Sequence, residues 1–117
     1  MTPRQMVRFG ELYASRGVAD GRQVIPGSWV DASFVPRGRS PISEQLYGYG
    51  WWIGAMADLP VYFAWGSGGQ YIFVFPPARL VVVRQVRLGA PEPSDEPAGF
   101  PGIGGLVANL ARSKMER

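Results

Sequence analysis

A glycine-rich break in the most apolar part of the chain is the stretch most suited to binding chemistry. Gly66-Ser67-Gly68-Gly69 follows the run Val61–Trp65 and precedes the run Gln70–Phe75. Glycine has no Cβ, so another group can approach the backbone closely at this break. The alternative is a glycine-rich entry to a strand that holds no ligand. Both interpretations place a sharp change of chain direction here.

The chain offers little for nucleophilic catalysis by its own side chains. It contains no cysteine and no histidine, and Lys114 is its only lysine. A nucleophilic serine needs a base within hydrogen-bonding reach, and histidine is the most common one. A triad that depends on histidine is therefore excluded for this chain by itself. The absence of cysteine also leaves the redox compartment, and with it the cellular location, undefined.

Metal ions and nucleic acids are disfavoured as ligands. Glu92, Asp95 and Glu96 lie in a proline-rich stretch, but their spacing fits no calcium-binding loop, so a solvated acidic loop is expected. We expect no metal and no other cofactor. The net charge is +3, and the eleven arginines are scattered rather than grouped. Without a basic block, the sequence gives little indication of a nucleic-acid surface.

Helical patterns occupy both ends of the chain. Residues 1–16 predict a helix with Thr2 as N-cap, Pro3 in its first turn and Gly17 as its stop. A second short helix is expected over 27–33, with Trp29 and Val30 facing inward. A closing helix is expected over 100–115, and it should cover one side of a sheet. Its predicted apolar face consists of Ile103, Leu106, Val107 and Leu110.

The middle of the chain predicts an antiparallel sheet. Strands are expected over 46–55, 61–65, 70–75 and 80–86, because these runs are rich in β-branched and aromatic residues and end at glycine or proline. Residues 37–44 predict a surface loop. The fold class is therefore α+β, with an antiparallel sheet of about four strands flanked by an N-terminal and a C-terminal helix. No apolar run approaches the roughly 18 residues of a membrane-spanning helix.

The order of these segments resembles a known family. TPRQMVRFGELY, GRQVIPGSWV, YGYGWWIG and AWGSGGQYIFVFPPARLVVV precede a final amphipathic helix. This order is similar to the C-terminal part of the serine β-lactamase-like hydrolases, which include class C β-lactamases, D-Ala-D-Ala peptidases (penicillin-binding proteins), esterases and 6-aminohexanoate-dimer hydrolases. The resemblance covers nearly the whole chain but only about the last third of the family's length. It implies a partial β-lactamase-like α/β domain.

The resemblance implies acyl transfer to a serine that this chain does not contain. The family's S-x-x-K and Y-x-N motifs lie upstream, and no serine here has a lysine three positions later. Tyr13-Ala14-Ser15 resembles Y-x-N only superficially, and Tyr13 is expected in the core. The family's third motif, K-T-G or H-x-G, aligns with the stretch that starts at Ala64, and only Gly66 matches it. Ala64 replaces the usual cation, so β-lactam turnover is in doubt.

The same resemblance assigns a binding role to the glycine-rich break. Ser67 aligns with the residue whose backbone N–H is the second donor of the oxyanion hole, and this role does not depend on the side chain. Trp65 and Gln70 would shape a nonpolar pocket with one polar contact. The implied substrate-binding residues are Trp65, Gly66, Ser67, Gly68, Gly69 and Gln70.

The expected organisation is a single partial domain over residues 1–117. It comprises the end of a helical region at 1–34, the sheet at 46–87 and the closing helix at 100–115. The missing part of such a domain would leave apolar surface and open strand edges. We therefore expect either self-association or pairing with a separate N-terminal half of the hydrolase, and a small acyl substrate for the complete enzyme.

A non-catalytic binding or oligomerisation module is the alternative function. Aromatic rings on an antiparallel sheet, with arginines around them, would bind a peptide or a single-stranded nucleic acid. This interpretation requires that most of the rings are exposed on one face. The rings are those of Tyr47, Tyr49, Trp51, Trp52, Phe63, Trp65 and Tyr71.

Overall fold

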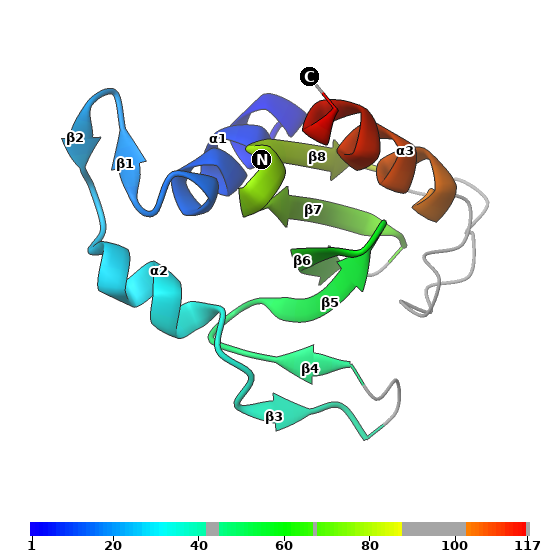
Figure 1. The fold of residues 1–117 in the computed structure, drawn as a ribbon, viewed down its shortest axis with the longest axis horizontal. Helices are drawn as coiled ribbons and strands as arrows, with labels where there is room; N and C mark the ends of the chain where they lie inside the picture. The colour runs from blue at the N-terminus through cyan, green and yellow to red at the C-terminus, as the bar shows by residue number, and fades with distance from the viewer. Residues whose placement is uncertain (42–44, 67, 88–102, 117) are drawn as a thin grey trace.

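A computed structural model describes residues 1–41, 45–66, 68–87 and 103–116, and Figure 1 shows their arrangement. Within this part, the structure is an α+β fold with three α-helices, a two-stranded hairpin and a six-stranded antiparallel sheet. None of the helices in the described ranges has the length and apolar character needed to cross a membrane. The elements, in chain order, are α1 (Pro3–Ala14), β1 (Val18–Ala19), β2 (Arg22–Gln23), α2 (Gly27–Ser33), β3 (Gly38–Arg39), β4 (Leu46–Tyr47), β5 (Trp52–Met56), β6 (Leu59–Gly66), β7 (Gln70–Phe75), the 3-10 turn η1 (Pro76–Ala78), β8 (Leu80–Arg84) and α3 (Gly104–Met115).

Helix α1 begins as the sequence predicts. The Thr2 hydroxyl accepts a hydrogen bond from the backbone N–H of Gln5, and the Gln5 side chain accepts one from the N–H of Thr2. This reciprocal capping box satisfies two N–H groups that a helix start otherwise leaves unpaired. Gly17 follows the helix with a φ of 90°, a conformation that glycine adopts without strain.

The strands of the large sheet follow one another as a meander in the order β3-β4-β5-β6-β7-β8. The antiparallel meander is confirmed, but the expectation of four strands is wrong. The predicted strand over 46–55 is two strands, because the chain turns between them at Gly50, which has a φ of 81°. The predicted loop over 37–44 contains β3, which pairs with β4. Strands of two residues are too short to give a periodic pattern in the sequence.

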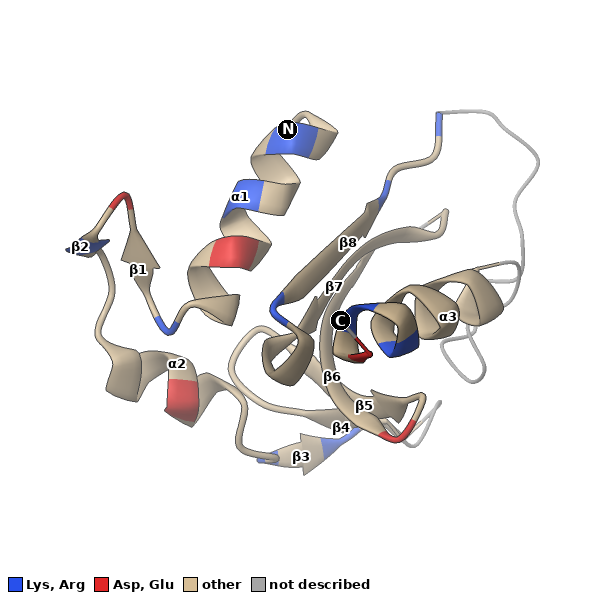
Figure 2. Cartoon of the chain, turned by 45° about the horizontal axis from the view of Figure 1, so that its top comes forward, with Lys and Arg blue, Asp and Glu red and all other residues tan. Residues whose placement is uncertain are grey.

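Both faces of the interior strand β7 are buried. Tyr71, Phe73 and Phe75 belong to one core cluster with Val107 of α3, whereas Ile72 and Val74 belong to a second cluster that includes residues of α1. Figure 2 shows α1 and α3 on opposite sides of the sheet. This double burial explains why the sequence of β7 is apolar almost throughout instead of alternating.

Gly10 allows α1 to lie close to the sheet. It is buried, and a Cβ at this position would be 2.6 Å from Cγ1 of Val81 and 3.0 Å from Cγ2 of Ile72. A larger side chain would push the helix away from β7 and β8. The glycine that weakens the helix locally is thus the residue that permits its packing.

The predicted faces of α2 and α3 are confirmed at Val30 and Val107, which are buried, but both helices are rotated relative to the prediction. Trp29 was expected to face inward, but its side chain is exposed and stacks on the ring of Tyr49. In α3, Val107 and Ala111 are buried, whereas Leu106 and Leu110 are exposed. A pair at i and i+4 with small side chains lets α3 approach the sheet closely, and the larger leucines then lie on its flank.

Candidate functional site

The glycine-rich break is a tight hairpin between β6 and β7. Gly66 pairs with Gln70 at the end of the ladder, and Gly68 and Gly69 have φ values of 83° and 85°. Positive φ is unfavourable for residues with a Cβ, which explains why glycine occupies both positions. Ser67, the implied oxyanion-hole donor, lies outside the described residues.

Gln70 has a structural role in the hairpin. Its side-chain Oε1 accepts a hydrogen bond from the backbone N–H of Val86 at 2.8 Å, and its Nε2 donates one to the carbonyl of Val86 at 3.1 Å. A Cβ on Gly66 would be 3.3 Å from the Cβ of Gln70, so Gly66 also makes room for this side chain. The amide that was expected to contact a substrate thus completes the pairing of β7 with the residues after β8.

The structure places the side chains of Trp65 and Gln70 on opposite faces of the sheet. Trp65 pairs with Tyr71, and Gly66 pairs with Gln70. Paired residues share a face of the sheet and neighbouring pairs alternate, so Trp65 and Gln70 point to opposite faces. Trp65 packs with the α3 cluster, and Gln70 lines a cleft with Met6 of α1.

The cleft beside Gln70 is open and has a volume of about 520 Å³. Its lining combines Met6, Gln85, Val86 and Arg87 with Gln70. The guanidinium of Arg87 gives it a positive charge, which would favour a ligand that carries a carboxylate. The sequence gives no sign of this cleft, because α1 and the end of β8 come together only through the tertiary fold.

The indole of Trp65 has a polar atom without a partner. Its Nε1 is buried, and it is the single buried side-chain nitrogen or oxygen in the described ranges that lacks a hydrogen bond. A buried donor left unpaired costs about 1–3 kcal/mol, so native structures contain few of them. The N–H is also closed to solvent, so a bound group does not reach it in this structure.

Trp65 is the last of three aromatic rings that cross the sheet. The ring of Tyr47 lies edge-on to that of Trp52 with a centroid separation of 4.7 Å, and Trp52 lies edge-on to Trp65 at 6.1 Å. These residues come from β4, β5 and β6 in turn. The row gives Trp65 an apolar wall on the side of the sheet that faces α3.

The seven rings of the alternative function do not form an exposed platform. Trp51, Phe63 and Tyr71 are at most 2% exposed, whereas only Tyr47 and Tyr49 reach 37% and 44%. The buried rings belong to the two core clusters on opposite faces. Their burial removes the accessible surface that recognition of a peptide or a single strand needs.

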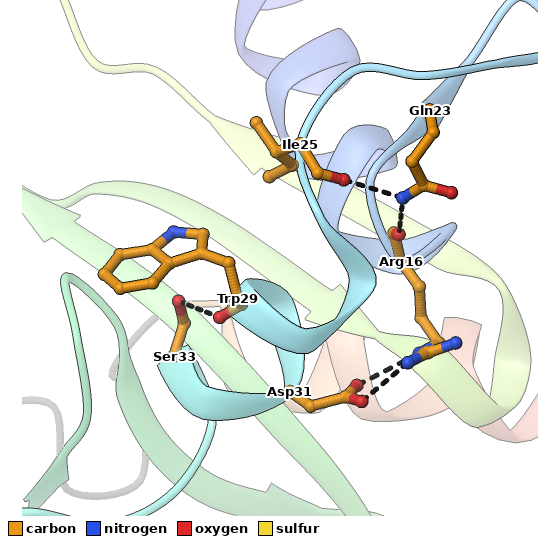
Figure 3. A network of polar contacts seen from close by, with 6 residues as sticks. All are labelled: Arg16, Gln23, Ile25, Trp29, Asp31 and Ser33. Atoms are coloured by element: carbon orange, nitrogen blue, oxygen red, sulfur yellow. Dashed lines mark hydrogen bonds and ion pairs between the residues drawn. The ribbon is translucent and has the colours of Figure 1, made fainter.

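A polar network fixes α2 against the end of α1, as Figure 3 shows. Nε of Arg16 donates to Asp31 at 3.0 Å, and Nη2 of Arg16 donates to the other carboxylate oxygen at 2.6 Å. The hydrogen bond from Arg16 lowers the pKa of Asp31 below its ordinary value of 3.8. Gln23 adds two bonds to backbone carbonyls, those of Arg16 and Ile25.

Tyr13 does not form a catalytic pair with Ser15. Its ring is buried between Phe9, Phe34 and Trp51, as expected for a core tyrosine. Ser15 donates its hydroxyl to the backbone carbonyl of Val18 at 2.6 Å. Within the described ranges, no cluster of three or more carboxylate, histidine or cysteine side chains could hold a metal, and Glu92, Asp95 and Glu96 lie outside them.

Comparison with known proteins does not assign the chain to a family. No family model matches it, and no curated protein matches it. The candidate site therefore rests on its geometry and on the segments that resemble the serine hydrolases.

Proposed function

We propose that this chain is the C-terminal part of a β-lactamase-like serine hydrolase. In the complete enzyme, an acyl group would be transferred from an amide, an ester or a β-lactam to a serine and then released by water. The nucleophilic serine and its base would come from the missing N-terminal half. This chain would supply the glycine hairpin, against which the acyl group lies. By itself it would hydrolyse nothing.

One observation carries this proposal: the turn that follows Trp65 directly is built largely of glycines. Gly66, Gly68 and Gly69 leave its backbone without side chains. Hydrogen-bond donors that are fixed before the reaction stabilise a developing oxyanion, and backbone donors tolerate a change of side chain. A substrate carbonyl would therefore be able to lie directly against the backbone of this hairpin.

The residues at the third motif favour esters and amides over β-lactams as substrates. Ala64 stands where the family has a lysine or a histidine, and in the structure it packs against the cluster on the α1 side. No cationic side chain therefore occupies this position. Arg87, in the cleft on the same face, would be able to bind a carboxylate in place of that cation.

The unpaired edge of the large sheet supports the proposal that this chain is only one part of the enzyme. β8 pairs with β7 on one side, and no strand in the described ranges pairs with its other side. Edge strands of natural proteins are usually protected by proline, by charge or by a covering element. The segment Val81-Val82-Val83 contains neither proline nor a charged residue, which is consistent with a missing neighbour.

The test compares this chain with the polypeptide encoded by the same reading frame extended upstream. We expect the extension to contain S-x-x-K and Y-x-N, and the extended protein to hydrolyse a p-nitrophenyl ester and to react with a fluorophosphonate probe. The chain alone should show no burst and no turnover with this ester or with a chromogenic cephalosporin. A burst from the chain alone would contradict the proposal, as would an extension that lacks both motifs.

A further inference from the structure

One edge of β8 has no strand beside it among the described residues. In an antiparallel pair, alternate residues direct both backbone groups toward the same neighbour. The N–H and C=O of Val86 bond to the Gln70 side chain and so point toward β7. By this alternation, the backbone N–H and C=O groups of Val82 and Arg84 also point toward β7. Those of Val81 and Val83 point to the opposite side, away from the sheet.

A groove follows this edge between β8 and helix α1. Two clefts of about 740 and 360 Å³ lie along it. Val81 lines the first and Val83 lines the second, and Glu11 of α1 borders both. The residues with free backbone groups are thus also the residues that line the groove. An added strand would find hydrogen-bonding partners and an apolar wall at the same place.

The rim of the groove is mostly basic. Arg79 borders the larger cleft, and Arg4 and Arg8 border the smaller one, against the single carboxylate of Glu11. Arg16 also borders the larger cleft, but it is paired with Asp31. Figure 2 shows basic residues, drawn in blue, on α1 and beside the start of β8. Opposite charges steer a partner toward such a surface and fix its position.

We propose that the β8 edge binds an extended acidic segment of another polypeptide as an added strand. Apolar side chains at alternate positions of this segment would face α1, and its acidic side chains would lie near Arg4, Arg8 and Arg79. Pairing with β8 of a second copy is disfavoured, because each copy carries a net charge of +3 and would bring its own basic rim. The proposal uses no residue of the glycine hairpin, but it concerns the same unpaired edge at which a strand of the missing half would lie in the proposed hydrolase. Its test measures peptide binding and not hydrolysis, so the two proposals can fail separately.

The probe is a fluorescein-labelled peptide of about seven residues, long enough for one strand. It alternates valine with threonine and carries glutamate at both ends. Its partner peptide carries lysine at both ends instead. We expect saturable binding of the glutamate peptide in fluorescence anisotropy and at least about tenfold weaker binding of the lysine peptide, a difference of about 1.4 kcal/mol. Added salt should reduce this preference.

Val83→Pro tests the backbone contact. Proline removes an N–H that points away from β7, so the sheet keeps its own hydrogen bonds while the added strand loses one. We expect binding of the glutamate peptide to fall at least about tenfold, the effect of losing roughly 1.4 kcal/mol. Val82→Pro is the contrast, because it removes a bond within the sheet and should destabilise the fold itself.

Arg4→Glu with Arg8→Glu tests the charge without touching the strand. Both positions are exposed on α1, so the variant should fold. It should lose its preference for the glutamate peptide, whereas Lys114→Glu on α3 should keep it. Equal binding of the two peptides by the unaltered protein, or binding that Val83→Pro leaves unchanged, would overturn the proposal. A dimer that Val83→Pro dissolves would also overturn it, by making a second copy the occupant.

Discussion

The side-chain amide of Gln70 pairs with both backbone groups of Val86. Oε1 accepts from the N–H at 2.8 Å and Nε2 donates to the carbonyl at 3.1 Å. A glutamine side chain here acts as one more residue of the sheet, since the regular register of β7 and β8 ends at Tyr71 and Arg84. The hairpin and the end of β8 are thereby held together beside the 520 Å³ cleft.

Gln70→Ala should therefore lower stability. The substitution leaves the N–H and C=O of Val86 without their partners, and both bonds are partly buried. We expect the free energy of unfolding in urea to fall by about 1–3 kcal/mol. Gln85→Ala is the matched control, because it removes a single exposed bond to the carbonyl of Met1 and should have a smaller effect. Equal losses in the two variants would contradict the structural role of Gln70.

Gly10→Ala should destabilise the protein although alanine favours helix formation. The added methyl would lie 2.6 Å from Cγ1 of Val81 and 3.0 Å from Cγ2 of Ile72, so more than one core side chain would have to shift. The gain in helix propensity is about 1 kcal/mol. Overpacking costs about 1–3 kcal/mol, so we expect a net loss of about 1 kcal/mol.

The control for this substitution is Gly105→Ala in α3. Nothing lies within 4 Å of a Cβ at Gly105, so this variant should gain up to about 1 kcal/mol from helix propensity alone. Thermal unfolding of both variants gives the comparison. A Gly10→Ala protein that melts above the unaltered chain would show that α1 does not lie as close to β8 as described.

The elements that the sequence predicts well are those whose signals are local. The capping pattern at Thr2 and the stop at Gly17 give α1 almost completely, and β7 agrees with the structure over 70–75. The rotation of α3 was not predictable in this way. Leu106 and Leu110 look like core residues, but the space beneath the helix accepts only Val107 and Ala111, and that space is made by distant residues of the sheet.

The candidate site shows the same division between local and tertiary information. The sequence predicts a glycine turn between two strands, and the hairpin is present at Gly66–Gln70. It does not reveal that Trp65 and Gln70 point to opposite faces, because they lie on different strands and only the register of the hairpin relates them. It also gives no sign of the bond partners of Gln70, because Val86 is adjacent only after β7 and β8 have paired.

Asp31→Asn should lower stability at neutral pH and have no effect in acid. The bond from Arg16 lowers the folded-state pKa of Asp31 below 3.8, so the stabilisation is present above that ordinary value. It is lost as the pH falls through the lowered pKa, because the carboxylate is then protonated in both states. Urea unfolding at pH 7 and in strong acid measures the difference.

The salt dependence and a second variant distinguish loss of the Arg16–Asp31 ion pair from the general effect of removing one negative charge. Both partners are exposed, so screening should reduce the effect of Asp31→Asn at high salt. Asp20→Asn removes the same charge from an exposed position in the β1–β2 turn and should show no such dependence. A difference between unaltered protein and Asp31→Asn that persists at low pH would contradict this assignment.

Gly48→Ala should disrupt the junction between α2 and the sheet. A Cβ at Gly48 would overlap the backbone carbonyl of Ser33, the same oxygen that accepts a hydrogen bond from Tyr49 at 3.0 Å. Backbone atoms cannot move aside as a flexible side chain does, so β4 must shift or the bond must break. Loss of this bond and the accompanying strain should lower the free energy of unfolding by about 2 kcal/mol or more.

Gly38→Ala, in the paired strand β3, is the control, because a Cβ there has nothing within 4 Å and should change stability little. Hydrogen exchange at Tyr49 would locate the damage, since its N–H should lose protection in Gly48→Ala and keep it in Gly38→Ala. Retained protection in both variants would mean that α2 is not anchored to the sheet through Ser33.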